Sequence, residues 1–360
     1  GLWDQTVQTG TPPYDLEYGS AYTQEEIDQA LEQEDPFSLI PSRDEIGHGT
    51  ALAGIAAGTS LPENDFKGAA PQAMIALVKL KPAKEYLKTL FYVTGDAPAY
   101  QMTDIMAGIR YLLRLSEELV RPLVICLGLG TSQGDHSGDS PLDSMLSITD
   151  QFRGFIGVSA AGNEAGRAHH YYGTALNSAQ YNAVEILVKE GTRGFCAELW
   201  GQPPEVYAVG FESPLGEVVQ KFTDPTPGSW KIRVYTGDYN SGSYHIWLPV
   251  TGFSDPDVTF LAPNPDTTIT SPGNSASVIT TGAYNAYNNS LYLNSSRGYT
   301  RTGQIKPDIA APGVNVSAPA PRNRYTAITG TSAAAAITAG AGALILEWGM
   351  NRTPSRIFNN

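Results

Sequence analysis

Three polar side chains, far apart in the sequence, have the types that acyl transfer requires. Ser332 precedes an alanine run, His48 stands between two glycines, and Asn163 follows Ala-Ala-Gly. A serine at a helix N-terminus meets unpaired backbone N–H groups and the positive end of the helix dipole, which favour the oxyanion formed when the serine attacks a carbonyl. Histidine titrates near neutrality and suits a general base. An asparagine amide can donate a hydrogen bond to the oxyanion.

Each of these side chains also has a structural interpretation. Serine is a preferred helix cap, and the alanines after Ser332 would then serve only close helix packing. A single histidine is more often structural than catalytic, and an asparagine after a strand is a common turn former. The chemical interpretation therefore requires a fold that brings the three side chains together.

The elements expected around these residues are typical of an α/β protein. Helices are predicted at 23–33, from His48 onward, and at 104–120, 141–152 and 332–348, and buried strands at 73–80, 123–127, 155–161 and 275–284. This alternation indicates a parallel sheet with helices on both faces. Functional residues in such sheets gather at the carboxyl ends of strands, where Asn163 and the segment Gly128-Leu129-Gly130 are placed. The latter could be an exposed edge that pairs with an extended peptide.

The pattern changes near residue 176 to short, partly alternating apolar segments separated by Gly, Pro and Asp. An inserted all-β domain, a sandwich or jelly roll, is predicted over 176–268, dividing the α/β domain into 1–175 and 269–360. The insert could be a binding module for a glycan or a partner domain, with a sugar platform made by its aromatic residues. The same residues could equally form core and cross-strand pairs: Trp200, Tyr207, Trp230, Tyr235, Tyr239, Tyr244 and Trp247.

Charge, hydropathy and cysteine content limit the classes of function that are compatible with the sequence. The 360 residues carry a formal net charge of −13, which argues against nucleic-acid binding. We find no run of about 18 apolar residues, so no transmembrane helix is predicted. Cys126 is expected to be a buried free thiol, and two cysteines cannot form a disulfide framework. His169 and His170 are adjacent and would point apart, so no metal site or cofactor is assigned.

Four ordered motifs resemble those of the subtilisin-like (subtilase) serine proteases. They are Gly-His-Gly-Thr at 47–50, Ala-Ala-Gly-Asn at 160–163, Lys-Pro-Asp-Ile-Ala-Ala-Pro-Gly at 306–313 and Gly-Thr-Ser at 330–332. The third motif is predicted to be a structural turn without a catalytic role. Together they cover roughly 40–175 and 270–350, outside the insert.

The resemblance implies a serine endopeptidase that acts on a protein or peptide substrate. It implies that Ser332 is the nucleophile, His48 the general base and Asn163 the oxyanion donor. It also implies that Gly128, Leu129 and Gly130 form part of the substrate-binding edge. Subtilases often bind structural calcium, but no ligands can be assigned in this sequence.

A narrower resemblance is to the clostridial Csp germination proteases. It is carried by Leu-Trp-Asp-Gln-Thr at 2–6, Asp-Glu-Ile-Gly-His-Gly-Thr at 44–50 and the β insert between the Asn and Ser motifs. Those proteins are subtilases with an inserted jelly roll that act on the precursor of a spore cortex-lytic enzyme. The resemblance implies a precursor-processing role and an extracellular, cell-envelope or spore-associated location.

One part of the subtilase pattern is missing. The family order is Asp, His, Ser, and the Asp should end an apolar strand so that its carboxylate holds the histidine ring. No aspartate before His48 has that setting: Asp4, Asp15, Asp28, Asp35 and Asp44. In the Csp-like proteins the Trp-Asp-Gln-Thr segment follows the catalytic Asp. We therefore expect the first strand and the triad Asp to lie upstream of Gly1, outside this chain.

Two consequences follow for activity. Loss of the orienting Asp costs about 10⁴ in turnover in a well-studied triad, so this chain by itself is expected to be poorly active or inactive. The run Ala333–Ala336 also stands where the family usually has Met-Ala-Ser-Pro, which is typical of a divergent member. An alternative therefore stays open, a pseudoprotease that keeps the fold as a binding or regulatory protein.

Overall fold

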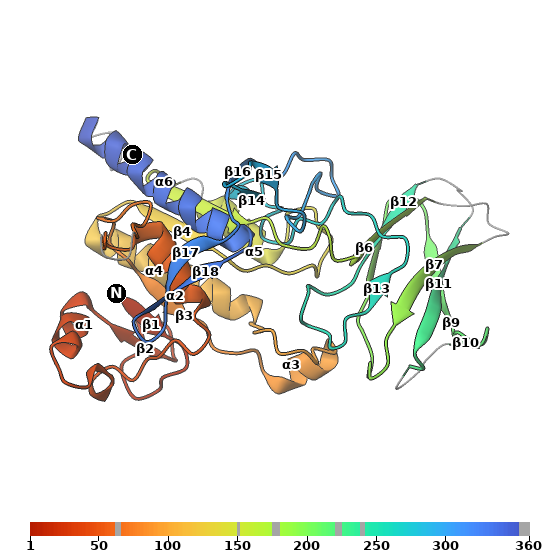
Figure 1. Ribbon diagram of the computed structural model, residues 1–360, viewed down its shortest axis with the longest axis horizontal. Coiled ribbons are helices and arrows are strands. Elements are labelled where there is room, and N and C mark those ends of the chain that lie inside the picture. The colour runs from red at the N-terminus through yellow and green to blue at the C-terminus, as the bar shows by residue number, and fades with distance from the viewer. Residues whose placement is uncertain (62–65, 150–151, 175–180, 220–224, 238–241, 353–360) are drawn as a thin grey trace.

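The computed structural model describes residues 1–61, 66–149, 152–174, 181–219, 225–237 and 242–352. Figure 1 shows an α/β part that carries both ends of the chain and a β-rich part that extends from one side of it. The arrangement agrees with the predicted α/β fold interrupted by an all-β segment. The jelly-roll topology and the domain limits stay predictions.

Helices form where the sequence pattern predicts them, with ends that differ by a few residues. A capping box opens the first helix: Thr23 Oγ1 accepts from the Glu26 N–H at 3.2 Å, and the Glu26 carboxylate accepts from the Thr23 N–H at 2.7 Å. The short helix α3 and a 3₁₀ turn at Pro36–Ser38 were not predicted. The α-helices are α1 (Gln24–Leu31), α2 (His48–Ala57), α3 (Glu85–Leu90), α4 (Met102–Leu119), α5 (Pro141–Thr149) and α6 (Thr331–Arg352).

The main sheet of the α/β part is covered by helices on both faces. Its order is β15-β14-β5-β4, with β16 also paired to β14, and the pairs β4–β5, β5–β14 and β14–β16 are parallel. On β4, Ile125 and Leu127 pack against α4 and α5, whereas Cys126 faces α2 and α6. The strands are β4 (Leu123–Leu127), β5 (Phe155–Ala160), β14 (Ile279–Asn285), β15 (Ser290–Leu291) and β16 (Ile309–Pro312).

Helix α6 is the long helix of this core. By length and composition it is also the one helix in the described ranges that could cross a membrane. That is weak evidence, because Ala333–Ala336 are fully buried between α2 and the sheet. The small side chains let the helix axis approach its neighbours closely.

A separate three-stranded sheet contains β1 (Leu2–Asp4), β2 (Ser20–Tyr22) and β3 (Leu77–Lys79) in the order β2-β1-β3, with β1 parallel to β3. The prediction of a buried strand at 73–80 is wrong in extent and burial, since the strand has three residues and Leu77 is 41% exposed. Within the described chain, β3 pairs only with β1, and β4 only with β5. Helix α4 contacts both: Gly108 faces Val78 of β3, and Ile109 packs on β4.

The motif at 306–313 is not only a turn, which corrects the sequence interpretation. Its second half is the strand β16, and the buried Lys306 Nζ donates to the Val278 carbonyl at 2.8 Å and to the Asp308 carboxylate at 2.7 Å. The antiparallel hairpin of β17 (Val316–Ala320) and β18 (Arg324–Ile328) follows and packs on α2.

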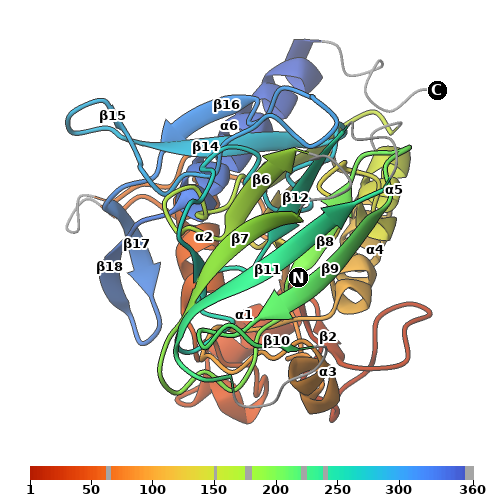
Figure 2. The same ribbon diagram turned by 90° about the vertical axis from the view of Figure 1, so that its right-hand side faces the viewer.

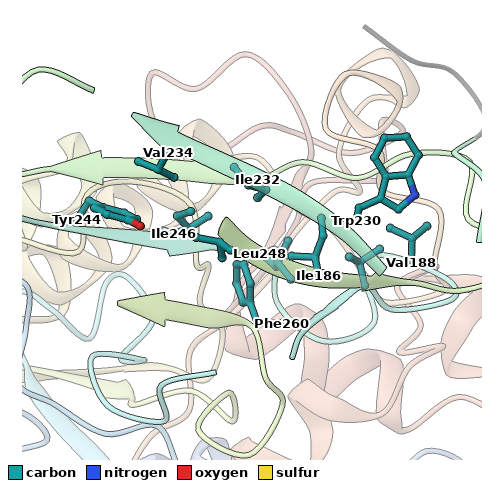
Figure 3. Close-up of a cluster of buried hydrophobic side chains, with 11 residues drawn as sticks. Ile186, Val188, Trp230, Ile232, Val234, Tyr244, Ile246, Leu248 and Phe260 are labelled. Atoms are coloured by element: carbon teal, nitrogen blue, oxygen red, sulfur yellow. The ribbon is translucent and has the colours of Figure 1, made fainter. Parts of the chain in front are cut away.

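The β-rich part consists of two antiparallel sheets, one with five strands and one with three. Their inner faces enclose a core that includes Ile186, Trp230, Ile246 and Phe260 (Figure 3). Figure 2 looks onto the five-stranded sheet, with β7, β11 and β9 side by side. The five-stranded sheet has the order β10 (Val218–Val219), β9 (Tyr207–Glu212), β11 (Gly228–Thr236), β7 (Tyr181–Val188), β13 (Thr259–Phe260). The three-stranded sheet has the order β6 (His170–Thr174), β12 (Ser243–Trp247), β8 (Glu198–Gly201).

Two sequence expectations about this part can be compared with the structure. Strand β6 already pairs with β12, so the strands of the two sheets begin before residue 176. Trp230, Tyr244 and Trp247 are buried, so these three rings belong to the interior and not to a sugar platform. Tyr239 lies outside the described residues.

A cluster of histidines joins the β-rich part to the α/β part. His136, in the loop after β4, stacks on Trp247 of β12 with ring centroids 3.9 Å apart. Its two ring nitrogens lie 2.8 and 2.9 Å from the carbonyl oxygens of Ile269 and Ser132. Burial lowers the pKa of His136, and a neutral ring can donate to only one of these oxygens. Next to it, His170 Nε2 lies 2.9 Å from His245 Nδ1.

Candidate active site

Ser332 lies in the first turn of α6, as the sequence predicts. The helix start is capped by Asn163, whose Oδ1 accepts from the Thr331 N–H at 3.0 Å and from the Thr331 hydroxyl at 3.3 Å. Ser332 is therefore not the residue that caps the helix by its side chain. Its Oγ donates instead to the Gly128 carbonyl at 3.0 Å.

His48 is the first residue of α2, at the other side of the same carbonyl. Its Nε2 lies 3.0 Å from the Gly128 oxygen, so the ring donates to the oxygen that Ser332 also uses. Asp44 fixes the chain before the helix by accepting from the N–H groups of Ile46, Gly47 and Thr50 and from the Thr50 hydroxyl. Burial opposes ionisation of this carboxyl, but these hydrogen bonds outweigh it and lower the pKa of Asp44.

Gly128 is the point where the candidate side chains meet. A methyl group built on its Cα would lie 2.1 Å from the Leu52 side chain, 3.4 Å from Ser332 Cβ and 3.5 Å from His48 Nε2. Only glycine leaves that space free. The following residues lead to an isolated antiparallel bridge between Thr131 and Ser271.

Asn163 lies beside the start of α6, next to the residue that precedes Ser332. Its Oδ1 is fully engaged with Thr331, which fixes the amide so that Nδ2 points the other way. Nδ2 makes no hydrogen bond to any residue in the described ranges. A Cβ at Gly330 would lie 3.3 Å from Nδ2 and crowd it, which explains the glycine before Thr331. The donor is thus free and oriented, as stabilising an oxyanion requires.

His48 has no carboxylate partner among the residues that the structure describes. Asp4, the aspartate at the end of β1, is fully buried and engaged elsewhere. It accepts from Thr6 and Ser42 and forms an ion pair with Lys79 at 3.1 Å. The absence of the triad Asp from this chain stays a prediction.

Over the described ranges, no cluster of three or more His, Cys, Asp or Glu side chains could hold a metal ion. Both cysteines are free, and burial raises the pKa of the Cys126 thiol to about 12, which leaves it unreactive near neutrality. His169 pairs with Glu164 and His170 with His245.

Sequence reasoning missed two residues that position the site. Thr331 links Asn163 to α6, and its hydroxyl also accepts from the Gly162 N–H at 3.1 Å. Asp44 holds the start of α2. The signal for Asp44 was an acidic residue just before a predicted helix start, with a threonine six residues later that could return a hydrogen bond.

The chain is similar to known serine proteases. The model of the subtilase family matches residues 1–188 and 198–357. The structure of the CspB protease of Clostridium perfringens aligns with a TM-score of 0.82 at 28% identity, covering 99% of this chain and 80% of that one. Serine protease AprX of Bacillus subtilis (strain 168) is 40% identical over 110 residues. That match spans 25% of this chain and 25% of the length of AprX.

Proposed function

The chain belongs to the subtilase family, and from this premise we propose that it is a serine endopeptidase in which Ser332, His48 and Asn163 carry out acyl transfer. In the tautomer that carries its hydrogen on Nδ1, His48 accepts the proton of Ser332 at Nε2 as Ser332 Oγ attacks the scissile carbonyl carbon, while Asn163 Nδ2 donates to the oxyanion. The protonated His48 then protonates the leaving amine, and the C–N bond breaks. Water, activated by the same histidine, hydrolyses the acyl-enzyme and restores Ser332.

The single observation that supports these roles is the meeting of Ser332 and His48 at one oxygen. Three elements distant in sequence, α2, the end of β4 and α6, converge there, and Asn163 accepts from the N–H of the residue before Ser332. A cap and a structural histidine would have no reason to meet. The segment Gly128–Gly130, which follows β4 at this oxygen, would pair with the backbone of a peptide.

The missing carboxylate belongs to the same proposal. Strands β3 and β4 each have one edge without a described partner, and α4 contacts both. A further strand between them would end near the start of α2, where a terminal Asp could reach His48 Nδ1. We expect that strand to be supplied by sequence upstream of Gly1, and this chain without it to be poorly active.

A fluorophosphonate that labels active serines tests the proposal. The chain as given is compared with a version extended at its N-terminus by an apolar strand ending in Asp-Thr-Gly, and Ser332→Ala of each is the control. We expect strong labelling of the extended protein at Ser332, weak labelling of the chain alone and none of the alanine variants. A correctly folded extended protein that is neither labelled nor able to cleave casein would favour the pseudoprotease alternative.

The likeness to the CspB protease supports a narrower role. The preferred substrate would be a protein precursor at the cell envelope or spore, and the β-rich part would be the jelly roll of that layout. Incubation of the extended protein with candidate secreted precursors, followed by mass spectrometry of the cut, tests this role. General casein hydrolysis without a defined cut in any precursor would count against it.

A further inference from the structure

One buried carboxylate links the β-rich part to the loop that carries Asn163. Glu164 follows Asn163 directly and is 6% exposed. Its Oε2 accepts three hydrogen bonds, from His169 Nδ1 at 3.1 Å, from the Thr251 N–H at 3.2 Å and from the Thr251 hydroxyl at 3.0 Å. His169 directly precedes β6, and Thr251 lies in the connection after β12. Both partners therefore belong to the β-rich part.

Both sides of this link are fixed to their surroundings. On the loop side, the Glu164 N–H donates to Ser296 Oγ at 3.0 Å, and the Ser296 N–H donates to the Gly162 carbonyl at 2.9 Å. On the other side, the connection after β12 is tied to the α/β part, because the N–H groups of Thr94 and Gly95 donate to the Phe253 carbonyl. Glu164 thus joins two anchored segments, and its movement would move Asn163.

A carboxylate in such a place needs its partners. Removing a charge from water costs several kcal/mol unless hydrogen bonds replace the lost hydration, so Glu164 is held where His169 and Thr251 reach it. The neighbouring Asn163 has one donor to direct at an oxyanion, and misplacement of a catalytic group by about 1 Å can cost about 10² in rate.

We propose that Glu164 is a positioning residue, through which the β-rich part holds the amide of Asn163 in its donating orientation. The proposal rests on the proposed function, because it concerns the oxyanion donor of that reaction. It gives the β-rich part a direct contribution to turnover, separate from any binding of a partner or glycan.

A double-mutant cycle in the strand-extended protein tests the proposal. For Glu164→Ala we expect kcat to fall about 10-fold while KM changes less than about 2-fold, since the donor acts mainly on the transition state. Asn163→Ala is expected to cost about 10²–10³, the loss known for one oxyanion donor in subtilisin. With Asn163 already removed, Glu164→Ala should change kcat less than about 2-fold, because the two residues act as a unit.

Two further variants separate positioning from stability. Glu164→Gln keeps an acceptor for Thr251 and loses only the charge facing His169, so its kcat should lie between those of the wild type and Glu164→Ala. Glu212→Ala is the matched control: Glu212 is also a buried glutamate, 8% exposed, paired with Lys231 and Arg233 on the five-stranded sheet. It should lower the free energy of unfolding and leave kcat unchanged.

The outcomes distinguish this inference from the function on which it rests. Equal effects of Glu164→Ala with and without Asn163 would overturn the positioning role while leaving the endopeptidase intact. A fall in kcat for Glu212→Ala as large as for Glu164→Ala would overturn it too. Absence of any turnover by the folded strand-extended protein would reject the proposed function and this inference together.

Discussion

At the scale of single residues, the start of α2 depends on one carboxylate. Asp44 accepts four hydrogen bonds around the turn that presents His48, as a helix cap does. We expect Asp44→Ala to lower the free energy of unfolding by about 1 kcal/mol, the usual value of a lost cap. Asp44→Asn should lose less, because its amide oxygen can still accept from Ile46 and Gly47. Urea denaturation of the three proteins at neutral pH measures both differences.

The pH dependence of that difference has a defined sign. The pKa of Asp44 is lowered in the folded state, so the folded chain binds a proton there less readily than the unfolded chain. The stability due to the carboxylate is therefore fully present above the unfolded pKa of about 3.9 and is lost as the pH falls through the folded value. The wild type and Asp44→Ala should differ equally from pH 5 to 7 and converge in strong acid. A constant difference at all pH values would contradict this role.

Residue chemistry was the part of the site that could be predicted from the sequence. Local sequence patterns single out His48, through its flanking glycines, and Ser332, through its place at the start of α6. The structure brings both side chains to the Gly128 oxygen. The partners of Glu164 and Asp4 could not be predicted. They come from connections far away in the chain. No local sequence pattern indicates that Thr251 donates to Glu164 or that Ser42 donates to Asp4.

At the scale of elements, the close packing of α6 predicts opposite effects on stability when either of two of its glycines is replaced by alanine. Alanine favours a helix interior over glycine by about 1 kcal/mol. At Gly342 an added Cβ would find its nearest neighbour, an Ile156 methyl, at 3.5 Å, so Gly342→Ala should stabilise the protein by about that amount. At Gly340 the Cβ would lie 2.5 Å from Ala69 Cβ and 2.6 Å from the Ala56 carbonyl oxygen.

Gly340→Ala is therefore expected to destabilise the protein by about 1–3 kcal/mol, because α6 would have to move away from α2. Thermal unfolding of both variants in parallel measures the contrast. Stabilisation by both would show that the two helices can separate without cost. The run of alanines predicts close packing in general, but the sequence does not say which glycine lies at the contact.

Element boundaries were predictable where the apolar period was long. Helix α4 has a clear amphipathic stripe, and β4 is a continuous apolar run, so both were placed correctly. The apolar run at 73–80 predicts a longer buried strand than β3, one edge of which has no described partner. Strand β16 was missed because Lys-Pro-Asp has the composition of a turn.

At the scale of the whole molecule, the junction between the two parts should respond to acid. Burial, the largest cause, lowers the pKa of His170 to about 3 and that of His245 to about 4. The charges of neighbouring groups act in the same direction, His245 and His136 on His170, and Arg301 and His136 on His245. An unfolded histidine ionises near 6.5, so below that pH the unfolded state binds more protons.

The free energy of unfolding should therefore fall as the pH drops from 6.5 to 5, by up to about 1.4 kcal/mol per pH unit for each histidine. Most carboxylates stay ionised in this window. Urea denaturation at several pH values measures the slope, and His245→Gln should reduce it. An equal slope in that variant would place the titrating group elsewhere in the chain.

The division into an α/β part and a β-rich part could be predicted, because the change from helical to alternating patterns is a property of long segments. Their junction could not. The stacking of His136 on Trp247 joins residues separated by more than a hundred positions, and each of them alone has the pattern of an ordinary loop or strand residue.

The Gly128 carbonyl oxygen has a consequence for how a substrate would arrive. In an extended pairing, this oxygen is an acceptor that an incoming peptide N–H would seek, yet Ser332 and His48 already occupy it. A peptide that docks on Gly128–Gly130 would displace both side chains from the oxygen in the same event. The serine hydroxyl and the imidazole would then lose their shared acceptor and turn to each other, so the substrate itself would release the pair for reaction.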